Sequence, residues 1–535
     1  MNISNIPGGD KRFFIIVASC LLLLSSFLHF WKIGEVPGGF FVDESSVAYN
    51  AWSLSVSGRD ENGAFMPLFI KSFDIYFSPV GIYSLAAFFK VFDPSTTGRA
   101  VSAIYFLMAS FMFYFLAYKL SGRKWLSLAG AFAFLILPWT FPLSRTIMGG
   151  YMPMIFFMTA GSYFLIRAIG EDCWKQAFAA GLSWSMAMYS HNTGRPMTAV
   201  LLVGFVLAYN VLLLKRWRTF LIFVVVYVLS LVPMMVAVWN NTGILLNRFK
   251  LVSVWHDQPG AYELFMRMAA KYLEYFKPQF FFINGDSNIR HGTGNAGIFF
   301  LFMAPLIIAG LYVLLRWCRH NPVYRFLVIA ILSYPIPGIL TTDHYHAART
   351  ISGAPFWCIA AVLGAVYLWR NVKMFKILLI IIPLMAVYEI PAYFRYYFRE
   401  YAAETRLVYA GPIIEAIRIS DENMRKGEIL YLSGSVFPQR VDRDFKPFWY
   451  IHVLFFLKIP PEAYQQGRIH DYARPYGGKV DAGGVLVVSN KVWSFDKQGD
   501  MVSIDNPEKL PENRKLIGRV EIDGSTALEI YRVDK

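Results

Sequence analysis

The stretch from Lys215 to Trp239 reads KRWRTFLIFVVVYVLSLVPMMVAVW and decides the class of fold. Three basic residues stand at its start, and the run from Thr219 to Trp239 then carries no charged side chain. Such a run is long enough to cross the hydrocarbon layer of a bilayer as a helix. Basic residues beside it are typical of the cytoplasmic end of a membrane-spanning helix. The stretch therefore predicts a transmembrane segment that begins on the cytoplasmic side.

Similar apolar runs recur along the whole chain. Hydrophobic residues occupy 56% of its 535 positions and the mean hydropathy is +0.42, so a soluble protein of this composition would expose large apolar patches. We identify about eleven segments that are apolar and long enough to span a bilayer. They are 13–30, 98–118, 125–142, 151–168, 175–190, 196–214, 219–239, 297–315, 326–341, 351–369 and 377–393. The shorter run 79–92 is predicted to be an interfacial or re-entrant helix.

The net charge of +15 fits this arrangement. Basic residues cluster in every second loop between the predicted spans, where they orient helices and contact anionic lipid headgroups, so the charge does not indicate nucleic acid. The alternate short loops hold one arginine each, namely Arg145, Arg195 and Arg349. This bias predicts a cytoplasmic N-terminus, and it would be reversed if 79–92 also crossed the membrane.

The N-terminal segment could be mistaken for a secretion signal. Lys11 and Arg12 precede the apolar run 13–30, but no small-residue cleavage site follows, so we predict an uncleaved first transmembrane helix. The four cysteines fall in predicted helices or cytoplasmic loops. They therefore indicate neither a disulfide framework nor a cysteine metal site.

The long segments that the predicted topology places outside the cytoplasm define the domain organisation. The tail is more polar than the rest, with strand-like runs that begin at Glu428, Gly484 and Ala527 and a helical pattern over 411–425. No internal repeat is found, which argues against an inverted-repeat transporter. We predict a polytopic α-helical membrane domain, 1–393, with outer loops 31–97 and 240–296, followed by an extracytoplasmic α/β domain, 394–535.

Two adjacent acids stand out in the first outer region. Asp43 and Glu44 follow the apolar run Phe40 to Val42, and a helical pattern begins at Ser45. A helix cap accounts for one acid at this position but not for two. A carboxylate here could instead accept the proton of an acceptor hydroxyl as that hydroxyl attacks a sugar carbon.

The isolated cations of the outer loops suggest the other half of such a reaction. If the leaving group is a phosphate, its charge grows as the bond breaks, and fixed cations and hydrogen-bond donors stabilise it. Arg145, Arg195 and Arg349 are placed for this role, with His191 and His346 as further donors. A single arginine in an outer loop could simply contact the lipid headgroups with its long side chain. Headgroup contact is a less satisfactory explanation for three arginines that lie in three separate loops.

The loop 240–296 supplies another polar group. Asn284-Gly285-Asp286 marks a turn, and Arg290 and His291 follow closely. These residues fit either an ordinary structured loop or direct contact with a substrate. Asp286 and His291, with Asp343, could in principle bind a metal, but their spacing matches no recognised ligand signature, and we predict no metal site.

The ordered set of these motifs resembles the GT-C superfamily of polyprenyl-phosphate-sugar-dependent glycosyltransferases. The likeness is to the bacterial branch related to protein O-mannosyltransferases and lipid A aminoarabinose transferases, and it covers roughly residues 13–393. The resembling blocks are Phe41-Val42-Asp43-Glu44 through Ala51, Gly58-Arg59-Asp60-Glu61-x-Gly63, Pro138-Trp139 through Ser144-Arg145, Tyr189-Ser190-His191-Asn192-Thr193-Gly194-Arg195, Asn284-Gly285-Asp286-x-Asn288-x-Arg290-His291 and Leu340-Thr341-Thr342-Asp343-x-x-His346-Ala347-Ala348-Arg349-Thr350.

The resemblance implies a GT-C fold in a bacterial inner membrane and an inverting transfer on its outer face. The donor would be a polyprenyl-phosphate-linked sugar, and the acceptor a glycan, lipid A, a protein or another lipid. Other GT-C enzymes use a divalent metal, whereas this branch works without a cofactor. The resemblance implies Asp43 as general base. We predict that Glu44 belongs to the same catalytic pair, that the donor phosphate is bound by Arg145, His191, Arg195, His346 and Arg349, and that the substrate-loop residues are Asp60, Asp286, Arg290, His291 and Asp343.

One departure from the family pattern leaves other functions open. Family members often carry an acid shortly after the Ser-Arg pair, and residues 146–151 contain none. Glu44 or Asp60 could take its place, the acceptor could differ, or the protein could bind the lipid donor without transferring the sugar. A transporter or flippase would place ionisable residues near helix midpoints, where this chain has almost none. A non-catalytic assembly protein that recruits an envelope partner through its tail is the remaining alternative.

Overall fold

The structure is a computed structural model that describes residues 8–89, 94–255, 257–371, 376–436, 439–440, 449–478, 480, 482–489, 491–495, 501–505, 510–522 and 525–534. The chain forms two compact units, which are described separately below. The first, which we call the helical unit, comprises Met1–Ile33, Ile75–Ser84 and Thr96–Tyr401. The second, the α/β unit, comprises Gly34–Asp74, Leu85–Ser95 and Ala402–Lys535.

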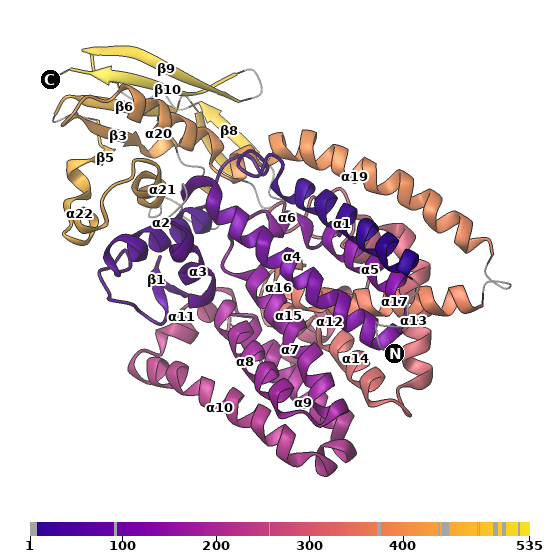
Figure 1. The fold of residues 1–535 in the computed structure, drawn as a ribbon. Helices are drawn as coiled ribbons and strands as arrows, with labels where there is room; N and C mark the ends of the chain where they lie inside the picture. The colour runs from indigo at the N-terminus through magenta and orange to yellow at the C-terminus, as the bar shows by residue number, and fades with distance from the viewer. Residues whose placement is uncertain are drawn as a thin grey trace. The chain divides into compact units, whose positions relative to one another are not determined.

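Helices dominate the chain (Figure 1). In chain order they are α1 (Gly8–Phe30), α2 (Val42–Ser57), α3 (Pro79–Phe89), α4 (Pro94–Ser121), α5 (Lys124–Ile136), α6 (Phe141–Ser144), α7 (Tyr151–Glu171), α8 (Trp174–Ser190), α9 (Gly194–Lys215), α10 (Trp217–Asn240), α11 (Gly243–Val252), α12 (Ala261–Glu274), α13 (Ala304–Trp317), α14 (Pro322–Ser333), α15 (Ile336–Ile339), α16 (Ala347–Thr350), α17 (Ala354–Arg370), α19 (Leu378–Val408), α20 (Gly411–Asn423), α21 (Trp449–Phe456) and α22 (Pro461–Gln465). The strands are β1 (Ile70–Ser72), β2 (Ile75–Phe77), β3 (Ile429–Ser433), β4 (Gln439–Arg440), β5 (Ala473–Tyr476), β6 (Gly484–Ser489), β7 (Lys491–Phe495), β8 (Met501–Asp505), β9 (Arg514–Ile522) and β10 (Ser525–Val533).

Among the described residues, seven helical segments are long and apolar enough to cross a membrane. The prediction of a polytopic helical membrane protein is confirmed, whereas the count of eleven spans is not. Two of the predicted spans are shorter helices in the structure, Lys124–Ile136 and Leu301–Trp317. The first ends early because Pro138 disfavours the helical conformation at Leu137, whose ψ is 137°.

Close helix packing in the helical unit depends on glycine. A Cβ atom on Gly310 of α13 would lie 1.8 Å from the carbonyl oxygen of Ala360 on α17. One on Gly364 of α17 would lie 1.9 Å from the carbonyl oxygen of Leu306. Small residues let two helix backbones approach closely, and this close packing stabilises helix association in membranes. The hydrophobic effect contributes little there, because the lipid tails are as apolar as the side chains. The helices α7, α8, α9 and α10 form a second packed group, in which α8 contacts the other three.

The α/β unit contains a five-stranded sheet with the order β5-β3-β6-β10-β9. Its β3 pairs parallel with β5 and β6, while β10 pairs antiparallel with β6 and β9. The helix α20 packs on β9 and β10 (Figure 1). The predicted strands at Glu428, Gly484 and Ala527 and the predicted helix at 411–425 correspond to β3, β6, β10 and α20, which confirms an α/β fold for the tail.

Candidate active site

The acid pair Asp43 and Glu44 lies in the first turn of α2, within the α/β unit. Glu44 is buried, and its Oε2 accepts the backbone N–H of Phe41 at 3.1 Å. This bond satisfies a backbone donor at the helix N-terminus, so Glu44 makes the capping contact. Asp43 is half-buried beside it. A carboxylate at the N-terminus of a helix is stabilising, because this end of the helix carries a partial positive charge.

The helix α2 is fixed by the C-terminal part of the same unit. Ser45 Oγ lies 2.9 Å from His452 Nδ1, and the hydroxyl of Tyr49 donates to the carbonyl oxygen of Ile459 at 3.1 Å. Burial lowers the pKa of His452 to about 4, so the imidazole is neutral at physiological pH. These contacts tie the position of Asp43 to a correctly folded tail.

Asp60, predicted as a substrate-loop residue, forms a turn. Its Oδ1 accepts the backbone N–H groups of Asn62 and Ala64, each at 2.9 Å, and the side chain is buried. The neighbouring Glu61 is also buried and accepts a hydrogen bond from Asn50 at 2.8 Å and one from Tyr450 at 3.3 Å. Burial raises the pKa of Glu61 to about 7.

The raised pKa of Glu61 makes the stability of the α/β unit dependent on pH. Because the folded state holds the proton more tightly, stabilisation is full below the ordinary pKa and is lost as the pH rises through about 7. Glu61→Gln imitates the protonated form, so its melting temperature should exceed that of the wild type at pH 8. The difference between the two proteins should become smaller as the pH falls and should vanish below the ordinary pKa of the carboxyl group. The melting temperatures are measured by thermal unfolding of the full chain. A difference in melting temperature that does not change with pH would contradict the raised pKa of Glu61.

Arg145 is an anchor for the end of α1. Its guanidinium donates to the carbonyl oxygens of Leu28, His29 and Trp31 at 2.7–2.8 Å. It also stacks over the rings of Phe141, Tyr397 and Phe398, and it is fully buried. A guanidinium used in this way neutralises the unpaired carbonyls of a helix C-terminus. We therefore leave Arg145 out of the donor site proposed below.

His191 and Arg195 lie at the junction of α8 and α9. The Nδ1 of His191 lies 2.8 Å from the hydroxyl oxygen of Thr193 and 3.2 Å from the backbone nitrogen of the same residue. The ring stacks on Tyr151, with centroids 3.9 Å apart. Arg195 opens α9 and donates to the hydroxyl of Ser78 at 3.3 Å. This corner therefore presents an imidazole and a cation beside a helix N-terminus, which is a favourable setting for an anion.

Arg349 lies on the short helix α16 and is buried. Its Nη1 contacts the hydroxyl of Thr341 and the carboxylate of Asp343, which is itself largely exposed. Asp343, predicted as a substrate-loop residue, thus balances the charge of Arg349 and sets its orientation. The Nδ1 of His346 accepts the backbone N–H of Arg349 at 3.2 Å.

The structure adds one cation that the sequence did not single out. Arg248 on α11 is half-buried, and its side chain makes no hydrogen bond or ion pair with the described part of the chain. Burial, with a smaller effect from the charges of Arg195, Arg349 and Arg248, lowers the pKa of His191 to about 3. Three arginines from three separate elements therefore gather around one histidine. In the sequence Arg248 is only one of several basic residues in the loop 240–296, so no pattern marked it.

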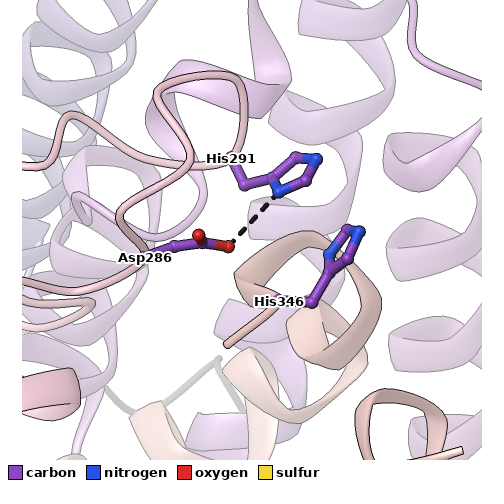
Figure 2. A group of neighbouring side chains, drawn as sticks. All are labelled: Asp286, His291 and His346. Atoms are coloured by element: carbon purple, nitrogen blue, oxygen red, sulfur yellow. Dashed lines mark hydrogen bonds and ion pairs between the residues drawn. The ribbon is translucent and has the colours of Figure 1, made fainter. Parts of the chain in front are cut away.

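Beside these cations lies a group of three buried side chains, Asp286, His291 and His346 (Figure 2). His291 Nδ1 is 3.3 Å from Asp286 Oδ2, and the imidazole rings of His291 and His346 stack with centroids 4.0 Å apart. Burial lowers the pKa of both histidines, and the charges of Arg290 and Arg349 add to this effect. The predicted turn at Asn284 is present, with Gly285 at φ 65°. Arg290 Nε donates to Asn288 Oδ1 at 3.1 Å.

The structure thus brings most of the predicted donor-phosphate residues into one region of the helical unit. His191, Arg195, His346 and Arg349 belong to it, together with Arg248. Asp43, Glu44 and Asp60 belong to the α/β unit. The chain is a polytopic helical membrane protein.

Comparison with solved structures supports this fold. ArnT from Cupriavidus metallidurans bound to undecaprenyl phosphate has a TM-score of 0.54 at 11% identity, and 98% of each chain is covered. The archaeal oligosaccharyltransferase AglB from Archaeoglobus fulgidus, in complex with an inhibitory peptide and a dolichol-phosphate, has a TM-score of 0.51 at 11% identity. The match covers 95% of this chain and 76% of AglB. No family model and no curated protein matches the sequence.

Proposed function

We propose that the protein is a membrane glycosyltransferase that moves a sugar from a polyprenyl-phosphate donor to an acceptor on the outer face of a bacterial inner membrane. The observation that carries the proposal is the gathering of Arg195, Arg248 and Arg349 around His191. Guanidinium groups gathered in this way suit a phosphate, because they donate charge-assisted hydrogen bonds to its oxygens. The similar proteins ArnT and AglB are bound to undecaprenyl phosphate and dolichol-phosphate, respectively, which supports a lipid phosphate as that ligand.

The proposed reaction is a single displacement with inversion. The acceptor oxygen forms a bond to the sugar C1 while the bond from C1 to the phosphate oxygen breaks. The proton of the acceptor hydroxyl passes to Asp43, and the polyprenyl phosphate leaves with the bonding electron pair. His191 and the arginines stabilise the charge that grows on the phosphate. Asp43 is assigned as base because Glu44 is already used in capping α2.

A reconstitution experiment tests the proposal against a flippase. The purified protein is placed in liposomes with a fluorescent polyprenyl-phosphate sugar and envelope extract as acceptor, and products are identified by mass spectrometry. A transferase yields a glycosylated acceptor and free polyprenyl phosphate. Movement of the donor between leaflets without a glycosylated product would instead identify a flippase. If neither transfer nor movement is detected, the protein is a non-catalytic assembly protein.

Comparison of cells with and without the gene identifies the acceptor. Mass spectrometry of envelope glycans, lipid A and exported proteins should show one sugar lost from one of these fractions. Restoration by the wild-type gene but not by a gene encoding Asp43→Asn would link that loss to transfer. An unchanged profile of all three fractions would contradict an outer-face transferase.

The proposed location of the α/β unit gives a separate prediction. Basic residues at alternate loops favour a cytoplasmic N-terminus and an extracytoplasmic C-terminus. A reporter enzyme active only in the periplasm should therefore be active when fused after the last residue. The matched fusion to a reporter active only in the cytoplasm should be inactive. The reverse pattern would place the α/β unit in the cytoplasm and remove the proposal of an outer-face reaction.

A further inference from the structure

We propose that the helix α12 rests on the surface of the lipid bilayer, with one of its faces inserted among the lipids. This face, which we call the exposed row, consists of Tyr262, Phe265, Met266 and Leu273, which are 79%, 66%, 48% and 67% exposed, respectively. Separations of three, four and seven residues place these side chains on one side of a helix. A row of large apolar side chains that the protein leaves open marks an interaction surface.

The exposed row is distinct from the face by which α12 packs on the helical unit. Leu264, Met268 and Tyr272 recur every four residues and are half-buried, and α12 contacts α15. The hydroxyl of Tyr272 donates to the carbonyl oxygen of Leu332 at 2.8 Å. The helix is therefore anchored to the protein along one face, while the described part of the chain leaves its exposed row open.

The third face of α12 is polar. It carries two acids and two bases, Glu263, Arg267, Lys271 and Glu274, and Arg267 pairs with Glu263 and with Asp257. A helix with large apolar side chains on one face and charged ones on another is suited to lie in the plane of a membrane interface. Because the charges of the polar face balance, we expect the apolar side chains, and not attraction to anionic lipids, to hold the helix there.

Continuity with the apolar surface of α10 points to lipid as the occupant of the exposed row. The helix α10 is one of the seven segments that can cross a membrane, and Val236 and Trp239 near its end are exposed. The helix α11 follows directly, and its Leu245 and Phe249 are exposed as well. Aromatic residues such as tryptophan and tyrosine gather where a membrane meets water. With 14 residues, α12 is too short to span the bilayer and suits its surface.

Docking of α12 on the membrane fixes the depth of Arg349, a consequence that rests on the proposed function. Lys271 Nζ contacts the carbonyl oxygen of Thr341, whose hydroxyl contacts Arg349. The hydroxyl of Tyr275, directly after α12, accepts the backbone N–H of His346 at 3.1 Å. The segment that carries Arg349 is therefore tied to α12 at two points. A helix held among the lipid headgroups keeps this arginine near the phosphate of a lipid donor.

Spin labels on the full chain in lipid nanodiscs test the location of α12. The label is attached to Phe265→Cys, Met266→Cys or Arg267→Cys in a chain whose four native cysteines are replaced by alanine. At Phe265 and Met266 we expect collisions with oxygen to be favoured over collisions with a water-soluble nickel chelate. The matched control at Arg267, on the polar face, should show the reverse, and nanodiscs with and without anionic lipid should give the same ratios. Ratios typical of water at all three positions, or spin coupling between labels of two chains, would overturn the proposal.

A measurement on the unmodified chain keeps the test valid if the cysteine-free chain fails to fold. Nanodiscs are prepared with a phospholipid that carries a photoreactive diazirine on the upper part of its acyl chain. Mass spectrometry should then find lipid attached to the exposed row and to Trp239 of α10. Labelling of Trp239 without labelling of the exposed row would overturn the proposal. Neither measurement requires a donor or turnover, so neither depends on the proposed function.

The consequence for Arg349 is tested by donor binding in nanodiscs. The double variant Phe265→Asp with Leu273→Asp should withdraw the exposed row from lipid. It should weaken binding of polyprenyl phosphate, by no more than the loss of about tenfold expected for Arg349→Ala. The matched control Arg267→Ala should bind as the wild type does. Unchanged donor affinity in the double variant would overturn the link between α12 and Arg349, whereas absence of binding by the wild type would contradict the proposed function and leave the location of α12 as measured.

Discussion

Asp43→Asn should lower the rate of sugar transfer by roughly a hundredfold or more, because loss of a general base removes an effect of that size. Asparagine keeps the shape of the side chain and cannot take up the acceptor proton. Donor binding should be unchanged, because the proposed donor site lies among the arginines of the helical unit. Turnover of a labelled polyprenyl-phosphate sugar and donor affinity are measured on the same purified preparation.

Two further variants make this result specific. Asp74→Asn is the matched control, because Asp74 is an exposed acid of the same unit, paired with Lys71 at 3.1 Å. It should keep the wild-type rate. Glu44→Gln retains an oxygen for the N–H of Phe41 and should lower the rate much less than Asp43→Asn. Near-normal turnover by Asp43→Asn, or an equal loss in Glu44→Gln, would contradict the assignment of Asp43 as the base.

The sequence predicted the parts of the fold that depend on local pattern. The charge-free run 219–239 became α10, and the alternating runs of the tail became strands of one sheet. The helix start at Asp43 and Glu44 was also predicted, because acids in a first helical turn are a local signal. Length and hydropathy could not settle the number of spans, since breaks such as the one at Pro138 shorten a run that looks continuous.

Residue roles that depend on distant contacts were not predictable. Arg145 resembled a phosphate ligand until the structure placed the carbonyls of Leu28, His29 and Trp31 around its guanidinium. Asp60 likewise bonds its own turn. Conversely, His346 joins Asp286 and His291 only because α16 packs beside a loop far away in the sequence. Spacing along the chain carries no signature for such a group.

Arg349→Ala and Arg248→Ala should each weaken binding of polyprenyl phosphate about tenfold or more, since a hydrogen bond to a charged group contributes about 1.5–3 kcal/mol. Each should also slow transfer, because the phosphate gains charge as the sugar leaves. Lysine should restore only part of the loss, since it lacks the planar fork of arginine. Native mass spectrometry of the solubilised protein with polyprenyl phosphate measures the affinity.

Arg145→Ala provides the opposite pattern and so tests the division of roles among the arginines. It would remove the hydrogen bonds of the guanidinium to three carbonyl oxygens, of which the bond to His29 is buried, so it should lower thermal stability. Folded protein of this variant should bind polyprenyl phosphate as the wild type does. The neutral control is Arg267→Ala, whose side chain pairs with the exposed Asp257 and Glu263. If Arg145→Ala loses donor affinity while Arg248→Ala and Arg349→Ala keep it, the phosphate lies at α1, and the site around His191 is not the donor site.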